Sequence, residues 1–151
     1  MINKKIFIAC PISKYLTNDG IKKDFELFIR DIYKFCKKYT CNVFLALERE
    51  KYGKKKMYGS ECTIADYEEM KTADILIAFP EDSCGVAVEI GWASAMQKEI
   101  LVFTDKAYKQ SELVMSINSI AKGKACMINT TYGYREEIFR IKQSIADYFE
   151  K

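Results

Sequence analysis

The chain has 151 residues, of which 49% are hydrophobic and 30% are charged, and its formal net charge at pH 7 is +3. These values are typical of an ordinary soluble globular protein, and we expect a single domain over residues 1–151. The small net charge gives no argument for nucleic acid binding, and no apolar run is long enough to span a bilayer. We therefore expect a cytoplasmic protein with neither nucleic acid nor membrane as a partner.

The first half of the chain predicts two strands and two helices. An amphipathic pattern begins after Asn18-Asp19-Gly20, which can start a helix, and repeats at spacings of three and four to about Tyr39. Charged residues and two glycines between Glu48 and Gly59 predict a mobile loop over the site. In chain order we expect a strand at residues 5–10, a loop at 11–15, the helix ending near 39, a strand at 42–47, the mobile loop, and a helix at 60–72.

The central stretch, residues 73–103, predicts a strand, a helix and a second strand. Residues 73–79 are almost continuously apolar, which is typical of a strand buried on both faces of a parallel sheet. Helical spacing follows over residues 86–97, and residues 99–103 are again apolar. This is a βαβ unit, which predicts a parallel sheet.

The remainder predicts a short helix at 112–121, a fifth strand at 124–128 and a last helix at 131–151. Five strands that alternate with helices indicate an α/β fold. We expect a doubly wound sheet, Rossmann- or flavodoxin-like, of about five parallel strands with helices on both faces.

Cysteine and histidine usage limits the chemistry. The chain has six cysteines and no histidine, and no two cysteines have CxxC spacing. The usual zinc sites, Ser-His-Asp catalysis and Cys-His catalysis are therefore excluded, and we expect no metal and no cofactor. We expect the cysteines to be free thiols that are mostly buried as small hydrophobic side chains.

Polar residues near the predicted carboxyl edge of the sheet are the candidate site. Glu89 is a carboxylate among apolar neighbours, just beyond the end of a strand, where open α/β sheets bind ligands. Ser83 and Gly85 open the same helix, so backbone N–H groups and a hydroxyl can bind an anion there. The structural alternatives are that Ser83 is simply the helix N-cap, that Glu89 pairs with a core Tyr or Lys, and that Asp66 is surface charge.

Taken together, these residues resemble a known family. Acidic and small residues flank the central strand in a fixed order: Asp66, Asp74, then Ser83-x-Gly85-x-x-x-Glu89-x-Gly91-x-Ala93. This order resembles the nucleoside 2-deoxyribosyltransferase superfamily. The superfamily includes nucleotide N-glycosidases, which hydrolyse 2′-deoxynucleoside 5′-monophosphates or CMP.

The resemblance implies roles for the two carboxylates. Glu89 matches the nucleophile that attacks the anomeric carbon and forms a glycosyl-enzyme intermediate. Asp66 matches an aspartate on the base side and is a candidate general acid, which a raised pKa would favour.

The resemblance also implies residues that bind the substrate. Ser83 stands where the nucleotide hydrolases have a serine near the 5′-phosphate and the transferases an aspartate. Ser116 matches a serine that reaches the phosphate from a neighbouring subunit, which implies a homodimer or a larger homo-oligomer. Ser13 and Lys14 occupy the hydrolases' phosphate loop, with Lys14 its only cation. Phe7 replaces the tyrosine that orients the glutamate, as in the CMP-hydrolase branch.

The leading hypothesis is an N-glycosidase that acts on a small-molecule nucleotide. The alternative enzyme is a nucleoside 2-deoxyribosyltransferase, which exchanges bases between deoxynucleosides. A non-catalytic nucleotide-binding module is the third hypothesis. Phe7 and the absence of arginines from the phosphate loop favour it, whereas the retention of Asp66 and Glu89 argues against it.

Overall fold

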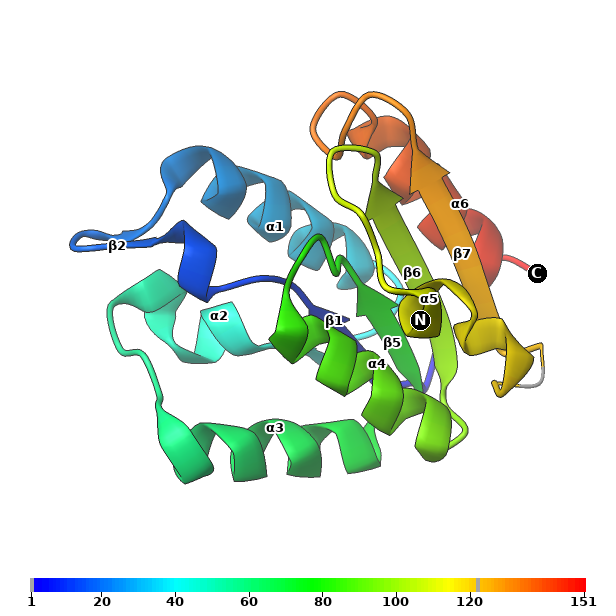
Figure 1. The fold of residues 1–151 in the computed structure, drawn as a ribbon, viewed down its shortest axis with the longest axis horizontal. Helices are drawn as coiled ribbons and strands as arrows, with labels where there is room; N and C mark the ends of the chain where they lie inside the picture. Colours follow the sequence, from blue (N-terminus) through cyan, green and yellow to red (C-terminus); the bar gives the residue numbers. More distant parts are fainter. Residues whose placement is uncertain (1, 122) are drawn as a thin grey trace.

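The computed structural model describes residues 2–121 and 123–151. One sheet of five parallel strands, in the order β4-β1-β5-β6-β7, forms its centre (Figure 1). Helices cover both faces, so the predicted doubly wound α/β fold is confirmed. The elements are β1 (Ile6–Ala9), η1 (Ser13–Tyr15), β2 (Leu16–Thr17), β3 (Gly20–Ile21), α1 (Lys23–Cys36), β4 (Val43–Leu45), α2 (Ala46–Arg49), η2 (Lys51–Gly53), α3 (Gly59–Thr72), β5 (Ile75–Ala78), α4 (Cys84–Ala95), β6 (Glu99–Asp105), α5 (Glu112–Met115), η3 (Ile117–Ser119), β7 (Ala125–Thr130) and α6 (Ile138–Phe149).

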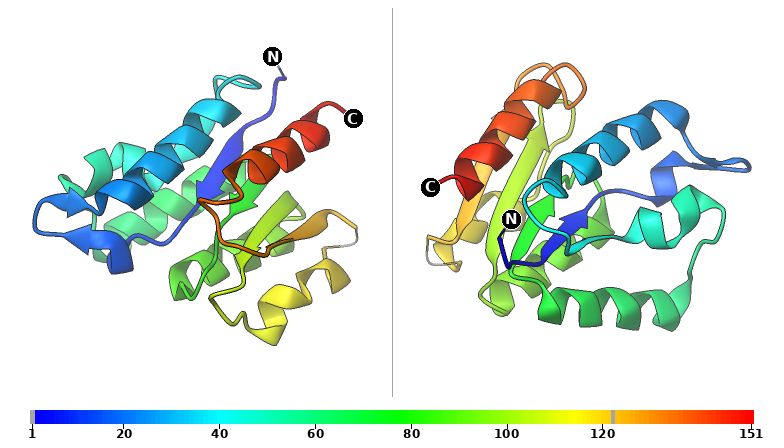
Figure 2. Two further views of the ribbon diagram at one scale, coloured as in Figure 1. Left: turned by 90° about the horizontal axis from the view of Figure 1, so that it is seen from above. Right: turned by 180° about the vertical axis from the view of Figure 1, so that it is seen from behind.

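Two apolar layers pack against the sheet, one on each face. Side chains alternate along β1, so Ile6 and Ile8 face one layer while Phe7 faces the other. The first layer packs under α1 and α6, and the second under α3, α4 and α5 (Figure 2). All four residues of β5 are buried, as a strand covered on both faces requires.

The strand order determines where a ligand can bind. The chain passes from β1 to β4 on one side of β1, then crosses back to β5 on its other side. The direction of winding therefore reverses between β1 and β5. A crevice forms at the carboxyl ends of the strands on either side of such a reversal, and it is the usual ligand site of open α/β sheets.

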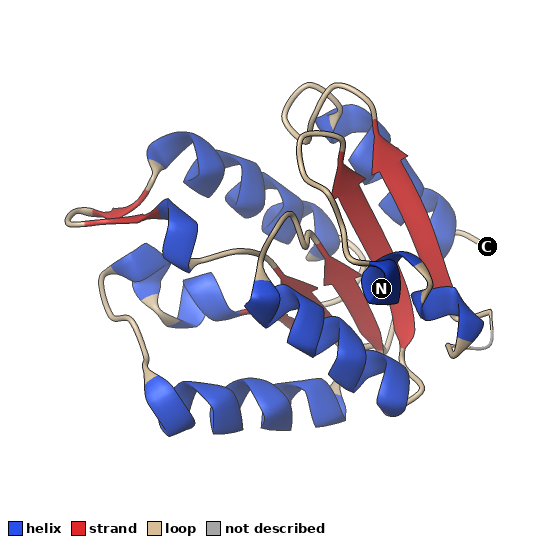
Figure 3. Ribbon diagram, in the orientation of Figure 1, coloured by secondary structure: helices blue, strands red, loops and turns tan. Residues whose placement is uncertain are grey.

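The predicted helix start at Asn18-Asp19-Gly20 is wrong. These residues belong to a small antiparallel hairpin of β2 and β3, and α1 begins only at Lys23 (Figure 3). Gly20 has φ +108°, and a Cβ there would lie 2.9 Å from the carbonyl oxygen of Tyr52. The hairpin therefore depends on a contact with a distant segment, which helical periodicity does not show.

The predicted loop over residues 48–59 is also wrong in its first part. The strand before it ends at Leu45, and the chain then folds into α2 and η2. Lys51 and Tyr52 are non-glycine residues with positive φ, at 50° and 53°. This compact turn follows from tertiary contacts rather than from local propensity.

Near the carboxyl terminus the boundaries shift. The predicted helix at 112–121 is divided into α5 and η3, and α6 begins at Ile138 instead of near Thr131. The Glu137 carboxylate accepts hydrogen bonds from the backbone N–H groups of Thr131 and Tyr132, which holds the preceding residues in a turn.

The expectation that most cysteines are buried is wrong. All six are free thiols, but only Cys10 and Cys36 are buried, whereas Cys41, Cys84 and Cys126 are exposed.

Across the described residues, none of the helices has both the length and the apolar character needed to cross a bilayer.

Candidate active site

A cavity of about 500 Å³ lies at the carboxyl ends of β1 and β5. It is built from the loop after β1, the segment between α2 and α3, one side of α3, and the N-terminal turns of α4. Six of the predicted site residues line it: Ser13, Lys14, Asp66, Ser83, Gly85 and Glu89. Because they come from segments far apart in the sequence, the fold brings them together at the predicted sheet edge.

Glu89 is the one charged residue of α4 and lies in the second turn of that helix. Its pKa is raised to about 8: burial is the largest cause, the Asp66 carboxylate adds to it, and the charge of Arg49 acts in the opposite direction. The alternative that Glu89 pairs with a core Tyr or Lys finds no support, because no such ion pair or hydrogen bond occurs among the described residues. A carboxyl group with so high a pKa in a cavity is a frequent mark of a functional site.

Asp66 lies on α3, and its carboxylate is mostly buried. Arg49 at the end of α2 donates from Nη1 to Asp66 Oδ1 at 2.7 Å, and Cys62 Sγ lies 3.6 Å from Oδ2. The ion pair fixes the position of the carboxylate and balances its charge. Arg49 was not predicted from the sequence, because it lies in a charged segment whose spacing carries no signal.

Ser83 is the N-cap of α4. Its Oγ accepts a hydrogen bond from the Val86 N–H at 3.3 Å, so the predicted cap is present. Gly85 follows in the first turn, and a Cβ there would meet only Ser83 Oγ, at 3.7 Å. The backbone of this turn is therefore open to the cavity, as an anion site at a helix N-terminus requires.

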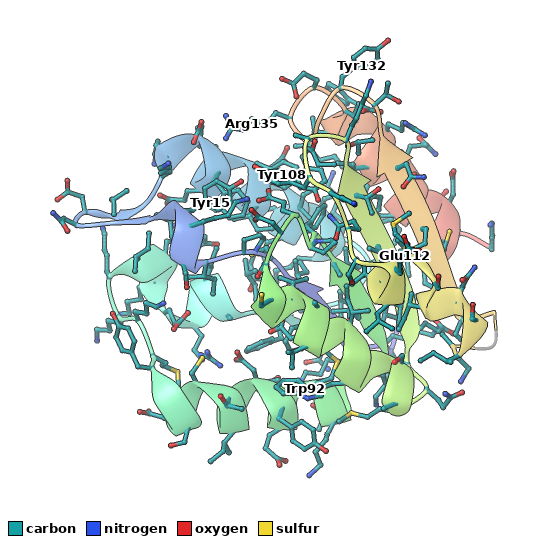
Figure 4. The ribbon with its side chains drawn as sticks, viewed as in Figure 1. Tyr15, Trp92, Tyr108, Glu112, Tyr132 and Arg135 are labelled. Atoms are coloured by element: carbon teal, nitrogen blue, oxygen red, sulfur yellow. The ribbon has the colours of Figure 1, made fainter. Side chains whose placement is uncertain are left out.

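Lys14 is held by acidic neighbours. Its Nζ lies 2.5 Å from the Glu81 carboxylate and 2.8 Å from that of Asp82. The rings of Tyr15 and Tyr108, labelled in Figure 4, lie 5.3 and 3.8 Å from the same nitrogen. The cation expected to bind phosphate is thus balanced by two carboxylates.

Two predicted residues do not line the cavity. Phe7 is completely buried in β1, where its ring packs 4.8 Å from that of Phe44. Ser116 follows α5 and is exposed on the surface. A contact between Phe7 and the substrate would require a change in this packing, and a role for Ser116 requires a second subunit.

The cavity also contains residues that the sequence did not single out. Glu50 and Met57 come from the segment between α2 and α3, and Cys62 contributes a thiol from α3. Within residues 2–121 and 123–151, no group of three or more Cys, Asp and Glu side chains is arranged to hold a metal ion.

Comparison with known proteins assigns the family. The family model for nucleoside 2-deoxyribosyltransferase matches residues 15–139, which is most of the chain. The chain belongs to the nucleoside 2-deoxyribosyltransferase family. The matched region contains Asp66, Ser83 and Glu89, the residues on which the resemblance was based.

Several solved structures share the fold of this chain. The CMP N-glycosidase BcmB of Clostridium botulinum superposes with a TM-score of 0.71 at 24% identity, over 96% of this chain and 99% of its own. BlsM gives 0.70 at 26% identity, over 85% of this chain and 81% of its own. A conserved protein from Enterococcus faecalis V583 gives 0.54 at 21% identity, over 93% and 98%. No curated protein matches the chain significantly.

Proposed function

We propose that this protein is an N-glycosidase that hydrolyses the N-glycosidic bond of a nucleoside or deoxynucleoside 5′-monophosphate. The observation that carries the proposal is the presence of Glu89 and Asp66 in one cavity, at the sheet edge where this fold binds ligands. The family match supports a substrate with an N-glycosyl bond. The likeness to BcmB, a CMP N-glycosidase, supports a nucleotide.

The proposed reaction uses the two carboxylates in two steps. The ionised Glu89 forms a bond to the anomeric carbon as the bond from that carbon to the base nitrogen breaks. Asp66 supplies the proton that the departing base requires, so the proton that Glu89 holds in the resting cavity passes to Asp66 as Glu89 becomes ionised. Water then attacks the anomeric carbon and passes a proton to Asp66, which releases Glu89 and the sugar phosphate.

Ser83 is proposed to bind the 5′ end of the substrate. It lies where the backbone N–H groups of α4 begin, so a phosphate would gain charge-assisted hydrogen bonds there.

A transferase that acts on nucleosides is the second candidate function, and one observation favours it. Glu81 and Asp82 already neutralise Lys14, which suits an uncharged 5′-hydroxyl better than a phosphate.

The direct test is an assay of base release with panels of nucleoside 5′-monophosphates and nucleosides, each with and without a free acceptor base. We expect free base and sugar phosphate from a monophosphate, with no need for an acceptor. Product that appears only with an acceptor base would establish the transferase. Binding of nucleotide without base release from any substrate would establish the non-catalytic module.

The substitution Ser83→Asp tests the 5′ assignment. Aspartate is also a good N-cap, so the helix should remain intact. A carboxylate ~4 Å from a phosphate at an effective dielectric constant of about 20 costs roughly 4 kcal/mol. We expect kcat/KM for the monophosphate to fall by orders of magnitude and that for the nucleoside to fall much less. Equal losses on both substrates would show that Ser83 does not face a phosphate.

A further inference from the structure

Glu50 is a buried carboxylate on the cavity wall that the proposed reaction does not use. It lies between α2 and η2, and only 2% of its surface is exposed. Its Oε1 accepts a hydrogen bond from the Met57 N–H at 2.6 Å. Its Oε2 is buried and has no hydrogen-bond partner among the described residues. A buried carboxylate oxygen without a donor is unfavourable, so the site is suited to a donor that a ligand supplies.

The segment that carries Glu50 lies on the same side of the cavity as Asp66. Arg49, its neighbour in the chain, donates to the Asp66 carboxylate at 2.7 Å, and Cys62 on α3 contacts the same carboxylate. Lys56 lines the cavity too, but it forms no ion pair with Glu50 in the described residues, and its ammonium lies 5.1 Å from the Tyr58 ring. Ser83, by contrast, belongs to the N-terminal turn of α4.

The proposed reaction assigns the two sides of the cavity to different parts of the substrate. The phosphate lies near Ser83, and the leaving base lies near its proton donor, Asp66. On this assignment of the substrate, Glu50 lies beside the base. The Met57 side chain, on the same wall, offers a polarisable apolar surface against which a flat ring can pack.

We propose that Glu50 is a specificity-determining residue, and that its Oε2 accepts a hydrogen bond from an exocyclic amino group of the base. This inference rests on the proposed function and extends it to the class of base. The substrate is then a nucleotide with an amino-bearing base, such as cytosine or adenine. A carbonyl oxygen in the same place would set its lone pairs against a buried carboxylate, which rejects uracil and hypoxanthine.

The test compares base release from CMP and UMP, and from AMP and IMP, by the wild type and by Glu50→Gln. Glutamine keeps an oxygen for the Met57 N–H, so the segment should hold its shape. Its amide NH₂ replaces Oε2 and can donate to a carbonyl. We expect the wild type to prefer the amino base by ~100-fold or more in kcat/KM, as a buried polar group left unpaired implies. Glu50→Gln should reduce that preference at least ~10-fold, mainly by improving the carbonyl base.

The control is Glu48→Gln, which removes an exposed carboxylate from α2 two residues earlier. It should leave the preference unchanged. A purely structural role for Glu50 predicts the same preference in the wild type and in Glu50→Gln. That result, or equal cleavage of both bases by the wild type, would overturn the proposal.

Binding separates this proposal from the proposed function. In Glu89→Gln and in Glu89→Gln/Glu50→Gln, the dissociation constants of CMP and UMP are measured by calorimetry. A preference for CMP that Glu50→Gln reduces supports the role of Glu50 even if no base is released. Base release without any preference overturns the role of Glu50 and leaves the proposed function standing. A failure of both nucleotides to bind overturns both.

Discussion

At the scale of single residues, the charges around Glu89 decide how the cavity responds to pH. Its pKa of about 8 in the folded protein lies well above the ordinary value of 4.5. Below about pH 4.5 both the folded and the unfolded chain hold the proton. Between 4.5 and 8 only the folded chain does, so the unfolded chain binds fewer protons and stability falls as the pH rises.

The substitution Glu89→Gln removes this pH dependence. We expect the variant to be as stable as the wild type near pH 4.5 and progressively more stable than it up to about pH 8, by at most ~5 kcal/mol, since each pKa unit corresponds to about 1.4 kcal/mol. The difference should be constant above that pH. Thermal melts of both proteins across the range measure it, and a difference that does not change with pH would contradict a raised pKa of Glu89 in the folded protein.

Activity should follow the opposite course. The nucleophile must be ionised, so the ionisation of Glu89 is expected to make kcat/KM rise with pH up to about 8 and to cause no further rise above that pH. The pH profile of kcat/KM measures this.

The substitution Asp66→Asn removes the neighbouring charge that raises the pKa of Glu89. A Glu89 pKa measured by NMR should therefore fall in that variant, and an unchanged value would show that the two carboxylates do not interact.

Which site residues the sequence can show depends on whether they break a pattern. Glu89 is visible because it is a charge in an apolar helix, and Ser83 because it precedes that helix as a cap. Arg49 and Glu50 are charged residues in a charged segment, where solvent exposure is the ordinary expectation. Only tertiary contacts, with Asp66 and Met57, distinguish them from surface residues.

At the scale of elements, the N-terminal turn of α4 is the part of the cavity best suited to an anion. Gly85 has no steric need for glycine, because a Cβ there meets only Ser83 Oγ. Its small size instead keeps the backbone N–H groups open to the cavity. The glycine lowers the stability of the helix and leaves room for a ligand.

The substitution Gly85→Ala separates these two effects. Alanine should stabilise α4 by about 0.5–1 kcal/mol, measured by urea unfolding. Its methyl group should also obstruct the proposed phosphate site and raise KM for the monophosphate by about tenfold, which corresponds to ~1.4 kcal/mol. An unchanged KM would mean that the 5′ end of the substrate lies elsewhere.

The elements themselves were predictable where burial imposes a strong pattern. The strands β1, β5 and β6 and the helix α4 follow from continuous apolar runs and helical spacing. The β2–β3 hairpin does not, because Gly20 is placed by its approach to Tyr52. The helix α2 was not predictable either, because it continues directly from β4 and no turn residue separates the two elements.

At the scale of the whole molecule, one surface is unusually apolar for an exposed face. The outer side of α4 presents Val88 and no charged residue, and Leu113 and Ile120 beside it are 84% and 61% exposed. These residues line a groove of about 620 Å³. Large contiguous apolar patches of this kind mark interaction sites. The expected homodimer stays a prediction, and we place its interface here, next to Ser116.

The substitution Leu113→Glu tests this placement. A charge at the centre of an apolar interface should dissociate the dimer, which sedimentation velocity measures directly. The control is Phe139→Glu on α6, at a side chain that is 83% exposed on the opposite face of the sheet. It should leave the assembly unchanged. A wild-type chain that is monomeric at working concentration would rule out a contribution of Ser116 to a neighbouring cavity.

The proposed mechanism is tested most directly by intact-protein and peptide mass spectrometry after reaction with a 2′-fluoro-arabinonucleoside 5′-monophosphate. The fluorine destabilises the oxocarbenium-like transition state, so the glycosyl-enzyme should break down slowly enough to be observed. We predict a mass increase equal to the fluorinated sugar phosphate, located on the peptide that contains Glu89 and absent from Glu89→Gln. Base release by the wild type without any adduct, undiminished in Glu89→Gln, would contradict a reaction that proceeds through Glu89.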